Sequence, residues 1–183
     1  MEERIGTGPA HSRVSARGVI AGAVVVMAVF GVLSELAGVF GFFPESGVLD
    51  AAGAEAILRG APVWSIAWIA AVLVGGFVAA ASTRATTLRD GALAGFVTWA
   101  VACLAMGMLF WVGFLAAVRL ELATPEFVGA LMQREVFLGA FVYDVAAMAA
   151  GAVGGLLGAR VEADAERRVR VRHVRVTTTT PVP

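Results

Sequence analysis

Residues 18–43 read GVIAGAVVVMAVFGVLSELAGVFGFF, an apolar run in which Glu35 is the one charged side chain. At 1.5 Å of rise per residue, about 20 residues are enough for a helix to cross the roughly 30 Å hydrocarbon core of a bilayer. Further apolar runs of this length follow at 62–81, 91–118 and 136–159. The sequence therefore predicts an all-α membrane protein with four transmembrane helices.

The composition of the whole chain agrees with this prediction. Of the 183 residues, 59% are hydrophobic and 15% are charged, and the mean hydropathy is +0.84, which is too apolar for a soluble domain. The first run also exceeds the roughly 7–15 apolar residues of a cleavable signal peptide, so we expect it to stay in the mature protein. All 14 basic residues are arginine, and Ala, Val and Gly are abundant, which suggests a GC-rich bacterial genome.

The arginines are distributed unevenly among the segments that flank the apolar runs. The N-terminal tail 1–17 holds three, the loop 82–90 holds two and the C-terminal tail 160–183 holds six, whereas the loops 44–61 and 119–135 are net acidic. Cytoplasmic loops retain positive charge. We therefore expect both termini in the cytoplasm, with the chain embedded in a bacterial cytoplasmic (inner) membrane.

The two acidic loops contain further helix signals. Residues 47–60 have the spacing of an amphipathic helix that would lie along the membrane surface. Thr124, Pro125 and Glu126 form a helix start, with a capping hydroxyl, a proline at the first position and an acid near the positive end of the dipole. We expect that second helix to continue into the span 136–159.

The chain resembles itself in two halves. The runs GVIAG at 18–22 and GALAG at 91–95 each open a helix after an arginine, and VGGFVAA at 74–80 matches VGGLLGA at 153–159 near the ends of the second and fourth spans. Each half is a hairpin of two spans with the same topology. The pattern predicts two similar hairpins and a possible internal duplication.

Many glycines within these runs are spaced for close helix packing. In membranes, small residues four apart allow helix backbones to approach each other. The glycines near one end of the bundle predict tight crossings toward the cytoplasm and a looser outer half. They are Gly18, Gly22, Gly75, Gly76, Gly91, Gly95, Gly151, Gly154, Gly155 and Gly158.

Two acids, Glu35 and Asp144, fall inside predicted spans, and each is about 12 Å from the outer end of its helix. Carboxylates in a membrane are costly and often functional. If their helices are neighbours, the pair could form a proton or cation site. The structural alternative is that Glu35, beside Ser34, hydrogen-bonds a neighbouring helix, while Asp144 pairs with an arginine of an outer loop.

Other side chains give weaker signals. The aromatic residues could form a ligand cage, but rings such as Trp64 and Trp111 are also expected at a membrane interface, and the others in lipid or in the core. Cys103 is the single cysteine, and Met106 and Met108 point to different helix faces, so we expect no soft-metal site. His11 and His173 lie in the tails without ligand spacing. The remaining aromatic candidates are Trp68, Trp99, Tyr143 and eleven phenylalanines.

No residues form a catalytic constellation, because the two intramembrane acids have no His, Ser or Cys partner suited to hydrolysis. The glycine pairs also lack the context of a phosphate-binding loop. We therefore expect a protein that is not an enzyme and that needs no cofactor or metal.

The C-terminal tail is rich in arginine. The acidic residues 162–166 could extend the fourth span as helix, and after them valine and arginine alternate with the period of a strand. Such a tail would associate with anionic lipid headgroups while largely disordered, or bind a partner by strand addition. We do not expect it to bind nucleic acid. The arginines concerned are Arg167, Arg168, Arg170, Arg172 and Arg175.

Three stretches together resemble an uncharacterised bacterial family of small four-span membrane proteins. They are RGVIAG at 17–22, GGFVAA at 75–80 and DGALAG at 90–95 with Trp99, and the likeness covers about residues 17–115. The family brings no established activity. The sequence favours a non-catalytic membrane accessory or scaffold subunit that packs against other membrane proteins or itself, and the alternative is a small transporter or channel that uses Glu35 and Asp144.

Overall fold

The computed structural model describes residues 14–40, 50–85 and 87–177, and their regular structure is helical. Four of the five helices are long and apolar enough to cross a membrane, which confirms the predicted fold class. The N-terminal tail up to residue 13, with His11, lies outside the described residues, as does 41–49. The helices are α1 (Ala16–Val39), α2 (Ala51–Ser82), α3 (Leu88–Arg119), α4 (Pro125–Leu131) and α5 (Arg134–Thr177).

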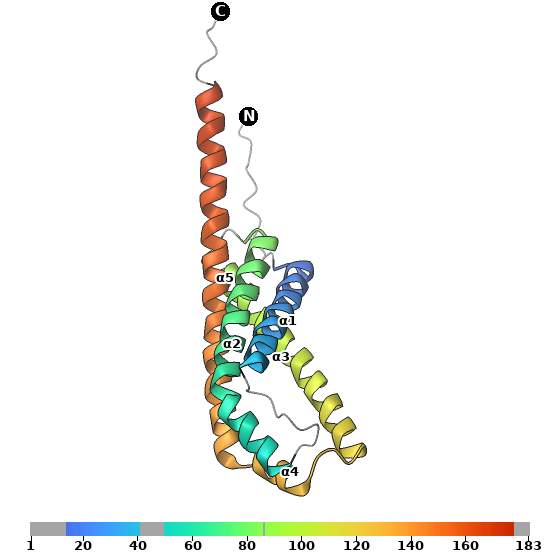
Figure 1. Cartoon of the computed structure of the whole chain (residues 1–183). Helices are drawn as coiled ribbons and strands as arrows, with labels where there is room; N and C mark the ends of the chain where they lie inside the picture. The colour runs from blue at the N-terminus through green and yellow to red at the C-terminus, as the bar shows by residue number, and fades with distance from the viewer. Residues whose placement is uncertain (1–13, 41–49, 86, 178–183) are drawn as a thin grey trace, which may run out of the picture.

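The four long helices form a bundle in which α2 and α5 pack closely together (Figure 1). Helix α1 packs on α2 and α3, helix α5 packs on α2 and α3, and α2 also contacts α3. Helices α1 and α5 therefore occupy opposite corners. The short α4 packs on α2. Helix α1 begins, and α5 projects outward, at the same end of the bundle (Figure 1).

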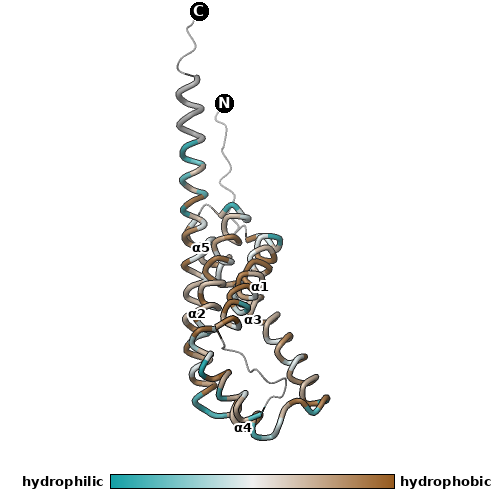
Figure 2. Tube along the Cα trace, in the orientation of Figure 1, coloured by the Kyte–Doolittle hydropathy of each residue, from teal (hydrophilic) through white to brown (hydrophobic). Residues whose placement is uncertain are grey.

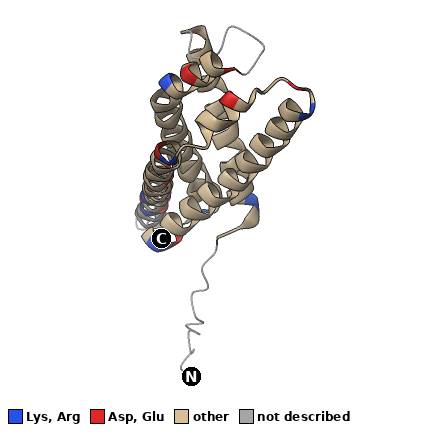
Figure 3. Cartoon of the chain, turned by 90° about the horizontal axis from the view of Figure 1, so that it is seen from below, with Lys and Arg blue, Asp and Glu red and all other residues tan. Residues whose placement is uncertain are grey.

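Polar residues define the helix ends, and apolar ones fill the space between them. Figure 2 shows the brown, apolar bodies of the spanning helices and the change to teal where α5 leaves the bundle. Seen from the opposite end, most charged residues lie near helix termini (Figure 3). A side-chain oxygen caps the first turn of each of the first four helices by accepting a backbone N–H. The caps are Ser15, Asp50, Thr87 and Thr124.

Two predicted helix boundaries were wrong. The surface helix and the second span are one continuous helix, α2, that contains Pro62. Proline removes only its own N–H bond to the carbonyl four residues earlier, and the flanking turns keep the helix intact. Conversely, α4 does not continue into the fourth span. It ends at Leu131, and α5 begins anew at Arg134, with the Gln133 carbonyl accepting the N–H of Val136.

The C-terminal tail continues as helix over 162–166, as expected, but beyond residue 166 it is different from the prediction. Its backbone is neither extended nor irregular but continues α5 as helix to Thr177. The spanning helix supplies a nucleus, so each added residue needs only propagation. Acids at 164 and 166 precede arginines at 168 and 170 by four residues, the spacing that supports a helix. The alternation of valine and arginine is therefore overridden by the preceding helix.

The first close crossing in the bundle joins α1 to α2. A methyl group placed on Gly22 would lie 2.6 Å from the carbonyl oxygen of Gly75, and one placed on Gly75 would lie 2.7 Å from that of Gly22. Gly18 similarly faces Thr83 and the carbonyl of Ala79. Because real Cβ atoms do not approach oxygen this closely, the backbones can meet only where both helices carry very small residues.

The second crossing, between α3 and α5, has the same form. A methyl group on Gly91 would lie 2.5 Å from the Gly155 carbonyl oxygen, and Gly95 faces the Gly151 carbonyl. In each hairpin, two glycines four apart thus face two small residues four apart. The contacts match Gly75 with Gly151, whereas the sequence repeat aligns it with residue 154, so internal duplication stays a prediction.

A third crossing joins α2 and α5. Gly76 on α2 faces the Gly151 carbonyl, Gly154 on α5 faces the Leu73 carbonyl, and a methyl group on Gly158 would lie 2.6 Å from the Phe77 carbonyl oxygen. Helix α5 therefore presents glycine to both of its neighbours.

Five other glycines among the described residues show where these close crossings stop. A methyl group on any of them would meet nothing within 4 Å, and on the spanning helices they lie in the half of the bundle away from the α5 projection. The predicted division into a tight and a loose half is confirmed for the bundle. These open positions are Gly31, Gly107, Gly113, Gly129 and Gly139.

Candidate functional site

An open cavity of about 530 Å³ lies in the loose half, between the four long helices. Its volume falls within the range of ligand pockets, about 300–1,000 Å³. All four spanning helices contribute to it, and α3 diverges from its neighbours at this level (Figure 1). The lining residues are Phe30 from α1; Ala61, Trp64, Ser65 and Trp68 from α2; Cys103, Met106, Gly107 and Phe110 from α3; and Ala140, Tyr143 and Asp144 from α5.

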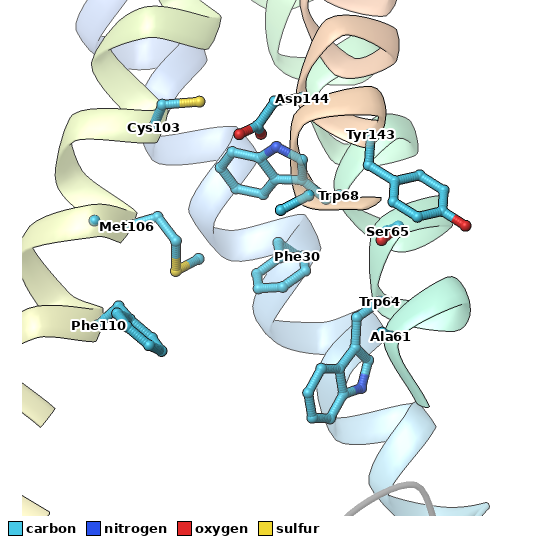
Figure 4. A pocket seen from close by; sticks show the side chains of 12 residues that line it. Phe30, Ala61, Trp64, Ser65, Trp68, Cys103, Met106, Phe110, Tyr143 and Asp144 are labelled. Carbon is cyan, nitrogen blue, oxygen red and sulfur yellow. The ribbon is translucent and has the colours of Figure 1, made fainter. Parts of the chain in front are cut away.

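The predicted residue Asp144 supplies the one carboxylate of this lining. Figure 4 shows its side chain directed toward the indole of Trp68, with the Cys103 thiol pointing toward it from α3. Asp144 is exposed to the open cavity. No arginine lines the cavity, and among the described side chains the salt bridge is the exposed Glu55–Arg59 pair, at 3.8 Å between Oε1 and Nε. The predicted pairing of Asp144 with an outer-loop arginine is therefore not formed.

Aromatic side chains dominate the rest of the wall. The rings of Phe30 and Trp68 meet edge to face, with centroids 5.3 Å apart and planes at 86°. Trp64 and Phe110 lie farther from Asp144, toward the lower end of the cavity in this view (Figure 4). Five of the aromatic residues that the sequence suggested for a ligand cage thus line one space: Phe30, Trp64, Trp68, Phe110 and Tyr143.

The other predicted aromatic candidates lie elsewhere. Trp99 packs against the buried core around Val26 and Ala71, and its ring centroid is 5.6 Å from that of Phe96. Its buried Nε1 has no hydrogen-bond partner among the described residues. Trp111 is exposed on α3. Trp99 thus follows the core alternative, and the place of Trp111 at a membrane interface stays a prediction.

The second predicted acid, Glu35, is not part of the cavity. It lies on the exposed side of α1, and α1 packs on α2 and α3 rather than against the helix that carries Asp144. The structure does not bring the two acids together as neighbours. The nearby Ser34 hydroxyl is buried and has no hydrogen-bond partner among the described residues.

The sulfur-containing residues separate as the helix period requires. Cys103 and Met106 line the cavity, whereas Met108 is 70% exposed on another face of α3. In the described parts of the chain, no group of three or more His, Cys, Asp or Glu residues is placed to hold a metal ion. Phe30 and Phe110 were not distinguished from the other phenylalanines by the sequence. Only their places along α1 and α3, level with the cavity residues of α2 and α5, set them apart.

Outside the membrane-spanning helices, Thr124 and Glu126 organise the start of α4. The Thr124 hydroxyl accepts the backbone N–H of Phe127 at 3.3 Å, as the sequence predicted. The backbone N–H of Glu126, followed by the Thr124 hydroxyl, lowers the pKa of the Glu126 carboxyl by hydrogen bonding.

No protein-family model, curated protein or solved structure matches the chain. The resemblance to small bacterial four-span proteins stays a prediction, and function must be argued from the fold and the cavity.

Proposed function

We propose that the chain is a non-catalytic membrane accessory or scaffold subunit that packs against another membrane protein or a second copy of itself through the outer half of α3. The proposal depends on how little of that helix the bundle covers. In the most apolar 18-residue stretch of α3, 6% of the residues are buried, against 44% in α2.

The exposed face of α3 has the spacing of a helix-packing seam. Of the eight large side chains exposed between residues 104 and 118, Leu109, Phe110 and Val112 lie outside this pattern. The other five recur at intervals of four and three residues, the heptad pattern of helices that pack along their length. Their exposed fractions run from 70% at the first two positions to 44% at the last. The seam consists of Leu104, Met108, Trp111, Leu115 and Val118.

Site-directed photocrosslinking tests this proposal. In a Cys103→Ala background the chain has no cysteine, so a benzophenone maleimide can be attached at Leu115→Cys alone. We expect irradiation of native membranes to give a discrete heavier product from this site. The matched control is Ile20→Cys on α1, whose exposed fraction is 59%, similar to the 56% of Leu115. Equal crosslinking at both sites, or none at Leu115, would show that the seam faces only lipid.

The same proposal includes a bacterial inner membrane with both chain ends in the cytoplasm. Support comes from the arginines. One end of the bundle holds the start of α1, the α5 projection, and the junction of α2 and α3, where Arg84 follows α2 and Arg89 lies in the first turn of α3. The projecting part of α5 contains Arg167, Arg168, Arg170, Arg172 and Arg175. We propose that it contacts anionic headgroups or a partner. A reporter fused after Pro183 should be active in the cytoplasm, and activity only outside the cell would contradict the orientation.

Transport is the second candidate function, and the cavity around Asp144 is the observation that favours it. Helix packing does not support the predicted pairing of Asp144 with Glu35, because α1 and α5 are not neighbours. Conduction of a proton, cation or solute would therefore depend on the Asp144 carboxylate alone. In liposomes, Asp144→Asn should abolish flux while Glu35→Gln retains it. Flux that survives Asp144→Asn would exclude this mechanism.

A further inference from the structure

The cavity combines one negative group with apolar walls, and this combination restricts what could occupy it. Apart from Asp144, the polar atoms that line it are a few groups such as the Ser65 hydroxyl and the Cys103 thiol. An ionised carboxylate inside a membrane is costly, so the Asp144 carboxyl is either protonated or accompanied by an opposite charge. No described residue supplies that charge, since no arginine lines the cavity and the chain contains no lysine.

The missing positive charge is better supplied by an organic ion than by a metal. Hard metal cations require about six oxygen ligands, and transition metals require several nitrogen or sulfur ligands. Here there is one carboxylate, and no cluster of three or more potential ligands occurs among the described residues. An organic cation needs only a counter-charge and a surface that accepts its hydrocarbon groups.

The walls fit the hydrocarbon part of such an ion. Phe30 and Trp68 form an edge-to-face pair beside Asp144, and Trp64 and Phe110 extend the aromatic surface (Figure 4). Aromatic faces attract cations, more strongly where water is excluded. The cavity is open rather than enclosed and lies in the half where α3 diverges from the bundle (Figure 1), so a ligand dissolved in the membrane has a way in.

We propose that the cavity binds a lipophilic organic cation, with Asp144 as its counter-charge and the rings of Phe30, Trp64 and Trp68 against its apolar groups. This site is separate from the exposed seam of α3. The inference does not rest on the subunit proposal, and binding can be measured whether or not the chain transports anything.

Two ions of nearly the same size and shape test the proposal. Tetraphenylphosphonium is a permanent cation and tetraphenylborate a permanent anion, so their comparison isolates the sign of the charge. We expect the full-length protein in detergent micelles to bind the cation in equilibrium dialysis and to show quenched tryptophan fluorescence. Asp144→Asn should weaken that binding at least about tenfold, because it removes the counter-charge. Glu35→Gln, at an intramembrane acid outside the cavity, should leave it unchanged.

A second pair of variants tests the location independently of charge. Gly107 lines the cavity and Gly113 does not, and a methyl group on either would meet nothing within 4 Å. Gly107→Leu should occupy part of the space and weaken binding, whereas Gly113→Leu should bind as the wild type does. Both substitutions place leucine in a helix in place of glycine, which favours folding.

Three results would overturn the inference. They are equal affinity for the cation and the anion, equal loss in Asp144→Asn and Glu35→Gln, and full binding by Gly107→Leu. Any of these would mean that the ions partition into the micelle or bind at another surface.

Discussion

The glycine crossing between α3 and α5 can be tested by adding a single methyl group at Gly91. In Gly91→Ala the new Cβ would lie 2.5 Å from the Gly155 carbonyl oxygen and 2.6 Å from the Ala159 Cβ. Carbon and oxygen atoms are normally about 3.3 Å or more apart. The helices must therefore separate by about 1 Å at this point. Backbone carbonyls cannot rotate away as a flexible side chain could.

The cost follows from the packing that this separation removes. A gap of about 0.5–1 Å forfeits a quarter to a half of the dispersion energy of the atoms that line it, and overpacking of this kind costs about 1–3 kcal/mol. The higher helix propensity of alanine returns about 1 kcal/mol. We therefore expect Gly91→Ala to lower the free energy of unfolding by up to about 2 kcal/mol.

Gly113 is the matched control, because it lies on the same helix and a methyl group there would meet nothing within 4 Å. Gly113→Ala should raise the free energy of unfolding by about 0.5–1 kcal/mol through helix propensity alone. Titration of both purified variants from mild detergent into dodecyl sulfate, followed by tryptophan fluorescence, measures the difference. If Gly91→Ala proved as stable as Gly113→Ala, the close crossing would not exist.

Three further predictions concern the helix ends. Glu121 closes α3 with a left-handed φ of 55°, so Glu121→Gly should raise the free energy of unfolding by about 0.5–1 kcal/mol while Glu121→Ala does not. The lowered pKa of Glu126 means that the ionised carboxyl stabilises the folded protein above pH 4.5, the ordinary pKa, and that this stabilisation is lost as the pH falls through the lower pKa of the folded state. An NMR titration of Glu126 should show a midpoint below 4.5, and Thr124→Ala should move that midpoint upward. Ala165→Pro should break the projecting part of α5 and reduce the helical circular dichroism signal, and no reduction would show that this part is not helical in solution.

Much of the bundle follows from the sequence because lipid imposes simple rules. A span needs about 20 apolar residues, and close crossings need small residues that recur on one face. Gly91 and Gly95 are four apart and lie at a crossing, whereas Gly107 and Gly113 are six apart, point in different directions and meet nothing. Spacing, not the presence of glycine, distinguishes a crossing from an open position.

Neighbour relations could not be obtained in this way. A spanning helix is apolar on every side, so its sequence does not mark which face meets which helix. Glu35 and Asp144 have similar expected depths, but depth does not reveal that α1 and α5 occupy opposite corners. The aromatic residues around Asp144 were recognisable as a type, and only the arrangement of the helices selects Phe30 from the other phenylalanines.

The tight half determines the geometry of the cavity through short stretches of helix. On every spanning helix, a residue of the cavity lies seven or eight positions from a crossing glycine, which is about 10–12 Å along the helix axis. Backbones held in contact at one end can diverge only as far as their crossing angles allow over that distance. The cavity therefore exists because the glycine contacts stop. A methyl group added at a crossing should change the shape of the cavity although it does not line the cavity. The pairs are Gly22 and Phe30, Gly75 and Trp68, Gly95 and Cys103, and Gly151 and Asp144.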